Sequence, residues 1–102
     1  MVSKKAANNG DDNSASREVT VINKLGVHAR PAAMFVKVAN RFESDITVAK
    51  DGEEVNGKSI MGLMMLAAGL DAKLVISAEG RDALTAVNEL AALFQRKFDE
   101  EQ

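Results

Sequence analysis

The chain has 102 residues, which is enough for one small domain, and 46% of them are hydrophobic, which is enough for a core. The absence of cysteine excludes disulfides, thiolate metal sites and cysteine catalysis. A formal net charge of −2 argues against nucleic-acid binding, and no apolar run approaches the roughly 20 residues that would cross a membrane.

The first 17 residues, MVSKKAANNGDDNSASR, differ from the rest of the chain in composition. They are mostly small and polar, and Val2 is their single large aliphatic residue. Such a segment buries too little apolar surface to offset the entropy lost on ordering. We therefore expect a disordered tail at residues 1–17 and one folded domain at residues 18–102. Because the N-terminus lacks the apolar segment of a signal peptide, we also expect a cytoplasmic protein.

Hydrophobic periodicity changes several times along the domain and predicts alternating strands and helices. β-branched residues at 19–22 predict a strand, and apolar positions at helical spacing predict a helix at 30–41. Later patterns predict strands at 46–49 and 54–56 around a turn, a helix at 59–68 ended by Gly69, a strand at 73–78 and a helix from about 83 to 98. The core stripe of this last helix consists of Ala83, Val87, Leu90, Phe94 and Phe98.

The order β-α-β-β-α-β-α predicts the fold class, which is α/β (α+β) in the form of a two-layer open-faced sandwich. We expect a four-stranded antiparallel sheet covered on one face by three helices. The other face should be largely open to solvent, which agrees with the polar residues Thr20, Thr47 and Ser77 on the predicted strands.

The only histidine, His28, lies in the segment LGVHARPAA, immediately before the first predicted helix. Pro31 is tolerated in a first helical turn, so His28 should be the N-cap or its neighbour, and Gly26 should let the preceding loop turn sharply. A helix start presents unpaired N–H groups and a partial positive charge, and both attract phosphate. An imidazole is partly neutral and nucleophilic near neutral pH. These features predict that His28 briefly holds a phosphoryl group.

Arg30 follows His28 by two residues and adds a permanent charge whose donors fit phosphate oxygens. Arginine is electrostatically unfavourable at a helix N-terminus by itself, which favours a functional reason for its position. Between Val19 and Phe42 there are four basic residues, Lys24 and Arg30 among them, and no acidic residue. We expect this segment to attract an anion or an acidic partner.

The alternative for His28 is an ordinary capping or surface histidine. A metal site is not expected, because the chain has no second histidine and no cysteine to complete it.

A second distinctive segment is GKSIMGLMMLAAG, at residues 57–69. Ser59 is suited to cap the helix that follows it. The methionines of this segment are neighbours at helical spacing, whereas Ile60 and Leu63 occupy another side. Because both sides are apolar, one of them should be exposed to a partner, and the sequence does not decide which.

The segment NKLGVHARPAA at residues 23–33, together with GKSIMGLMMLAAG and the order of elements, resembles the HPr family. These proteins are the histidine-containing phosphocarriers of the sugar phosphotransferase system, and the resemblance covers residues 18–102. It implies that His28 is phosphorylated on Nδ1 and that Arg30 steadies the phosphoryl group. It also implies that Ser59 is a regulatory site for an ATP-dependent HPr kinase/phosphorylase.

The resemblance implies that the carrier itself holds no cofactor, and it implies partners as well. Enzyme I, charged by phosphoenolpyruvate, would donate the phosphoryl group, and a IIA component of a sugar permease would accept it. An apolar patch of Ile60, Met61 and Met64, with Lys24, would form the partner-binding surface. The family is usually monomeric, and its members are carriers rather than enzymes, so we expect a monomeric carrier that inserts into no membrane.

Two other functions stay open at this point. One is a regulatory binding module that docks through phosphorylated Ser59, as related proteins without the histidine do, although His28 argues against this as the sole role. The other is a nitrogen-related branch of the phosphotransferase system. An independent hydrolase or transferase is the weakest hypothesis, because the motif has no acid or nucleophile beside its histidine.

Overall fold

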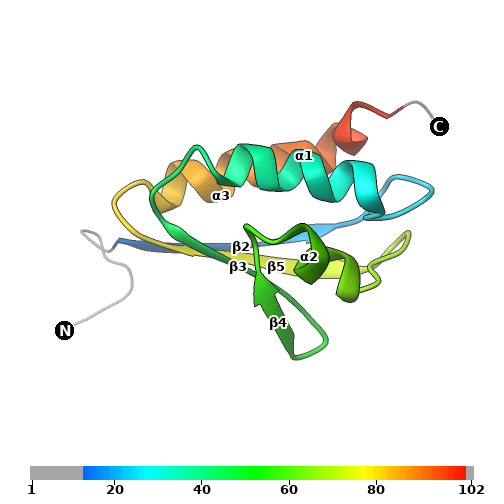
Figure 1. Cartoon of the computed structure of the whole chain (residues 1–102), viewed down its shortest axis with the longest axis horizontal. Coiled ribbons are helices and arrows are strands. Elements are labelled where there is room, and N and C mark those ends of the chain that lie inside the picture. Colours follow the sequence, from blue (N-terminus) through cyan, green and yellow to red (C-terminus); the bar gives the residue numbers. More distant parts are fainter. Residues whose placement is uncertain (1–12, 101–102) are drawn as a thin grey trace.

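The computed structural model describes residues 13–100, and its elements follow the predicted order (Figure 1). The strands are β2 (Ser14–Thr20), β3 (Asp45–Lys50), β4 (Glu53–Asn56) and β5 (Lys73–Glu79). The helices are α1 (Ala29–Ala39), α2 (Ile60–Met65) and α3 (Ala83–Gln95), and a short 3-10 turn, η1 (Lys97–Asp99), follows α3. None of these helices has the length and hydropathy of a membrane span.

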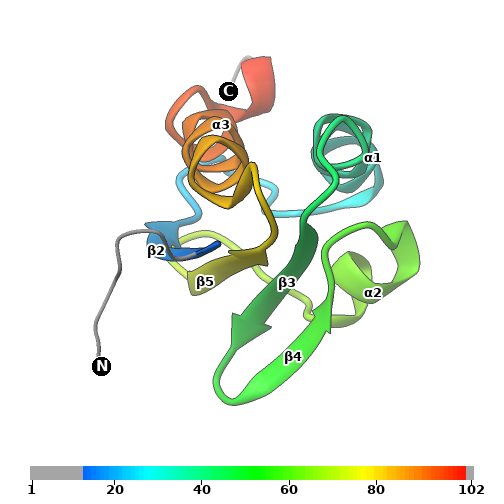
Figure 2. The same cartoon turned by 90° about the vertical axis from the view of Figure 1, so that its left-hand side faces the viewer.

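The four strands form one antiparallel sheet in the order β2-β5-β3-β4. Helices α1 and α3 lie side by side on one face of this sheet, and α2 packs against α1 and β4 (Figure 2). This architecture confirms the predicted open-faced sandwich. Thr20, Thr47 and Ser77 alternate with buried strand residues and are themselves half-buried.

The core lies between the sheet and the helices α1 and α3, and aromatic side chains fill its middle. Phe35 of α1 meets Phe94 of α3 edge-on at a centroid distance of 6.1 Å, and Phe94 meets Phe98 at 4.8 Å. The whole predicted stripe of the last helix is buried, as expected from its spacing: Ala83, Val87, Leu90, Phe94 and Phe98. Edge-to-face aromatic pairs of this kind add to the stabilisation that burial supplies.

The first strand begins earlier than predicted, at Ser14 rather than at Val19. Its N-terminal half pairs with β5, with Ser14 opposite Glu79 and Arg17 opposite Ile76. The ladder uses backbone groups, so the polar side chains that suggested a tail do not prevent pairing. The expected boundary between residues 17 and 18 therefore falls inside a strand, and residues 1–12 of the expected tail lie outside the described residues.

The second helix ends earlier than predicted, at Met65, and Leu66 is its C-cap. Ala67, rather than Gly69, takes a left-handed backbone conformation, with φ of +51°. Leu66 and Ala68 on either side of it are buried, and the Ala68 carbonyl accepts a hydrogen bond from the N–H group of Val27 at 2.9 Å. Tertiary packing thus overrides the local preference for glycine at this turn.

The last helix is also shorter than predicted and ends at Gln95, after which η1 reverses the chain. Phe98 keeps its buried place in the stripe although it lies outside the helix. The helical spacing therefore predicted the burial of Phe98 correctly and its backbone conformation incorrectly.

The loop before β3 is fastened to the start of α3 by Asp82, the N-cap of that helix. Its carboxylate accepts hydrogen bonds from the N–H groups of Glu43 and Ser44, at 3.0 and 3.1 Å, and from the Ser44 hydroxyl. The Ser44 hydroxyl, followed by the Glu43 N–H group, lowers the pKa of Asp82 below its ordinary value of 3.8.

Candidate functional site

His28 is the N-cap of α1, which agrees with the prediction from its sequence context. Its backbone is extended, with φ of −90° and ψ of −165°, and its carbonyl accepts the first helical hydrogen bond from the Ala32 N–H group at 3.0 Å. The imidazole makes no capping hydrogen bond to the helix, and 38% of the side chain is exposed. The ring therefore lies at the helix start but remains accessible to a reactant.

The loop before His28 is held against the chain that follows α2. Gly26 has φ of +73°, and a Cβ atom at this position would come within 2.5 Å of the Ala68 carbonyl oxygen. Only glycine fits this combination of a left-handed backbone and a close approach. The neighbouring hydrogen bond from Val27 to Ala68 fixes the same contact, so the loop carrying His28 and the segment after α2 are positioned together.

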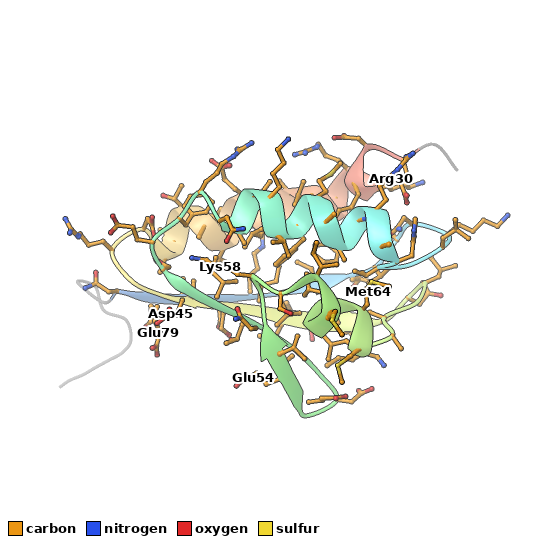
Figure 3. The ribbon with its side chains drawn as sticks, viewed as in Figure 1. Arg30, Asp45, Glu54, Lys58, Met64 and Glu79 are labelled. Atoms are coloured by element: carbon orange, nitrogen blue, oxygen red, sulfur yellow. The ribbon has the colours of Figure 1, made fainter. Side chains whose placement is uncertain are left out.

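Arg30 and Lys24 are both exposed near this helix start. Arg30 lies in the first turn of α1, and Figure 3 shows it toward the same end of the molecule as Met64. Within residues 13–100, the guanidinium of Arg30 takes part in no ion pair. It is therefore available to an incoming anion.

The structure adds two residues, Glu100 and Asn23, to which the sequence analysis gave no role. The Nε2 atom of His28 lies 2.9 Å from Oε2 of Glu100, whose side chain is only 9% exposed. The buried amide of Asn23 donates to the other carboxylate oxygen of Glu100 at 3.2 Å and to the Gly26 carbonyl at 2.7 Å. One signal in the sequence was the run of acidic residues that includes Glu100, but only the fold brings Glu100 to the histidine.

The two ring nitrogens of His28 consequently differ. Nε2 is hydrogen-bonded to Glu100, whereas Nδ1 forms no hydrogen bond within the described part of the chain. No cluster of three or more metal-ligating side chains occurs among the same residues. The arrangement suits a nucleophilic nitrogen at a positively charged helix start.

Ser59 is the N-cap of α2, and its Oγ accepts a hydrogen bond from the Gly62 N–H group at 2.9 Å. The predicted capping role of Ser59 is therefore confirmed. Its hydroxyl is half-buried, at the start of a helix that packs against α1.

The exposed side of α2 carries the methionines, which answers the question that the sequence left open. Leu63 is the buried residue of the helix, whereas Met61 is 75% exposed and Ile60 and Met64 are exposed to a lesser degree. Leu25, in the loop before His28, is exposed as well. Exposed apolar side chains thus occur both on α2 and in the histidine loop, which is typical of a protein-binding surface.

Comparison with known proteins finds a family, curated relatives and solved structures that this chain resembles. Residues 15–96 match the family model described as the PTS HPr component phosphorylation site. The phosphocarrier protein HPr of Treponema pallidum is 48% identical over 83% of this chain and 97% of its own length. A crystal structure of HPr from Thermoanaerobacter tengcongensis matches with a TM-score of 0.83 and 44% identity, over 86% of this chain and 99% of that one.

A further solved structure is that of Crh, a catabolite-repression protein of Bacillus subtilis. It is 49% identical, with a TM-score of 0.67, over 78% of this chain and 91% of its own, and it is described as a dimer with a swapped domain. The fold and the family match define a phosphocarrier of the phosphotransferase system, which carries a phosphoryl group and is not a catalytic enzyme. The chain belongs to the HPr family.

Proposed function

We propose that His28 accepts a phosphoryl group on Nδ1 from Enzyme I, charged by phosphoenolpyruvate, and passes it to a IIA component of a sugar permease. The observation that carries this proposal is the environment of the His28 imidazole. It lies at the N-cap of α1, is partly exposed, makes no cap to the helix and leaves Nδ1 without a hydrogen bond among the described residues. A nucleophile needs an accessible lone pair of this kind.

Arg30 has the role of stabilising the phosphoryl group in this proposal. Its exposed guanidinium is two residues from His28, and the unpaired N–H groups of the first turn of α1 add partial positive charge. Both features favour the negative charge that a phosphoryl group brings to the helix start.

The partner-binding surface in this proposal consists of Ile60, Met61 and Met64 on α2, with Lys24 in the loop before His28. All four residues are exposed. An apolar patch accompanied by a basic residue fits a partner that presents an apolar patch with acidic residues around it. Enzyme I and the IIA components would bind here in turn, because the surface adjoins the histidine loop.

Ser59 is the site of regulation in this proposal, through an HPr kinase/phosphorylase. A phosphoryl group on Oγ would add nearly two negative charges beside the apolar surface. It would also modify the oxygen that accepts the hydrogen bond from the Gly62 N–H group. Such a charge opposes the docking of an apolar or anionic partner. The likeness to Crh favours a second candidate function, in which phosphorylated Ser59 makes this chain a regulatory binding module.

The carrier acts as a cytoplasmic monomer in this proposal. The swapped dimer described for Crh makes the oligomeric state worth measuring. Size-exclusion chromatography with light scattering on the full chain tests it, and a stable dimer at low micromolar concentration would contradict the monomer.

Intact-mass spectrometry after mixing the protein with Enzyme I, magnesium and phosphoenolpyruvate tests the carrier function. We expect one acid-labile phosphoryl group on the wild type and none on His28→Ala. No addition by an Enzyme I that phosphorylates a known HPr would contradict the sugar branch, and addition by a nitrogen-branch donor would assign the chain there. Addition of acid-stable phosphate to Ser59 by ATP and an HPr kinase, with His28 inert, would favour the regulatory module.

A further inference from the structure

The C-terminal end of the described chain returns to the start of α1 and brings a carboxylate to the imidazole. Figure 1 shows this red segment at the same end of the molecule as the beginning of α1. Glu100 meets Nε2 of His28 at 2.9 Å, and its side chain is nearly buried. We propose that Glu100, held in place by Asn23, is a positioning residue for His28 in phosphoryl transfer. This inference rests on the proposed function of His28.

Asn23 explains why the carboxylate is held rather than free. Its amide is 1% exposed, and the two protons on Nδ2 serve two acceptors, the Gly26 carbonyl at 2.7 Å and Oε1 of Glu100 at 3.2 Å. A buried amide with both protons in use fixes the place of both acceptors. Asn23 thus ties Glu100 to the loop that leads into His28.

The turn η1 has an unusual backbone conformation, which directs Glu100 toward His28. Lys97, Phe98 and Asp99 have φ of +56°, +54° and +59°, a conformation that residues other than glycine seldom adopt in succession. Phe98 anchors the turn by packing edge-on against Phe94 in the core. Strained backbone persists where the surrounding structure over-determines it and is frequent at functional sites.

The contact determines which ring nitrogen can react. A carboxylate only accepts hydrogen bonds, so Nε2 must carry the proton, and the lone pair of a neutral ring is then on Nδ1. In the transfer, this lone pair forms the new N–P bond while the bond between phosphorus and the donor atom breaks and returns its electron pair to the donor. Nε2 keeps its proton, so the ring becomes positively charged, and Glu100 stabilises that charge as a carboxylate does in a catalytic triad.

The first test is NMR of the untagged full chain, in which His28 is the only histidine. We expect the Nε2–H group of the wild type to give a hydrogen–nitrogen correlation that is protected from solvent exchange. Glu100→Ala should lose this signal. The matched control is Glu89→Gln, which removes one carboxylate from the exposed side of α3, and it should keep the signal. Equally fast exchange in the wild type and in Glu100→Ala would overturn the proposal.

The second test is the rate of phosphoryl transfer from Enzyme I, measured by rapid quench. We expect Glu100→Ala to be slower by about tenfold, the effect of losing one hydrogen bond to a charged group in the transition state. Glu100→Gln keeps an acceptor without the charge and should show a smaller loss, while Glu89→Gln should match the wild type. Circular dichroism and thermal unfolding of each variant verify that it is folded.

The outcomes separate this inference from the proposed function. A wild type that takes no phosphoryl group from an active donor contradicts the proposed function, whatever the NMR signal shows. A wild type that is phosphorylated, with Glu100→Ala phosphorylated equally fast, overturns only the positioning role of Glu100.

Discussion

Helices α1 and α2 begin with similar backbones but use the side chains of their N-caps differently. His28 and Ser59 both have extended backbone angles. Ser59 directs Oγ back to the Gly62 N–H group and satisfies one of the orphan donors of its helix. His28 makes no such bond, and its imidazole contacts Glu100 from the other end of the chain.

The difference follows from what else holds each helix. α1 has 11 residues and buries six of them, so packing stabilises it without a side-chain cap. α2 has six residues and buries only Leu63, so its cap is a larger share of its stability. Packing thus holds α1 without a capping hydrogen bond to the His28 side chain, whereas the short helix α2, with its exposed apolar side, keeps the bond to its N-cap residue.

The first prediction concerns the charge at the start of α1. Replacing Arg30 by alanine should slow phosphoryl transfer from Enzyme I by about 10- to 100-fold, because the variant would lack the charge-assisted contact to the phosphoryl oxygens that we propose for Arg30. Rapid-quench measurement of the transfer rate checks this prediction. Lys37→Ala, which removes an exposed charge from the last turn of the same helix, is the matched control. Equal rates for the two variants would contradict a specific role for Arg30.

Much of the fold was predictable, because hydrophobic periodicity and helix capping depend on residues that are close together in sequence. The stripe ending at Phe98 and the N-cap positions of His28 and Ser59 depend on neighbours a few residues away in sequence. The early start of β2 was not predictable in this way, because Ser14 is in a strand only through its partner on β5.

The candidate site likewise contains some residues that the sequence could indicate and others that it could not. His28 and Arg30 could be found from one short segment, since helix-start electrostatics involve adjacent residues. Glu100 is 72 residues away from His28 along the chain, and it arrives through a left-handed turn that no local pattern indicates. Asn23 lies in the same segment as His28, but its role can be recognised only once the position of Glu100 is known.

The second prediction concerns the start of α2. Ser59→Ala should lower the free energy of unfolding by about 1 kcal/mol, because the Gly62 N–H group loses its capping acceptor. Urea denaturation with a fixed m-value measures the change. Ser16→Ala, at an exposed position of β2, is the control and should stay within about 0.5 kcal/mol of the wild type. A Ser59→Ala variant as stable as the control would mean that α2, like α1, does not depend on its cap.

The third prediction concerns the start of α3, where Asp82 occupies the N-cap position but its side chain binds the loop before β3 instead of the helix. The Ser44 hydroxyl and the Glu43 N–H group lower its pKa in the folded state below 3.8. A lowered carboxyl pKa contributes stability that is present above pH 3.8 and is lost as the pH falls through the folded-state value. Urea midpoints measured across this acid range should therefore fall more steeply for the wild type than for Asp82→Asn.

The control for this third prediction is Asp51→Asn, which changes an exposed carboxylate in the turn between β3 and β4. Its urea midpoints should follow those of the wild type across the same acid range. If Asp82→Asn also follows the wild type, the hydrogen bonds from Ser44 and Glu43 do not distinguish the folded from the unfolded state. The start of α3 would then resemble that of α1, with stability set by packing, and α2 alone would depend on the side chain of its N-cap.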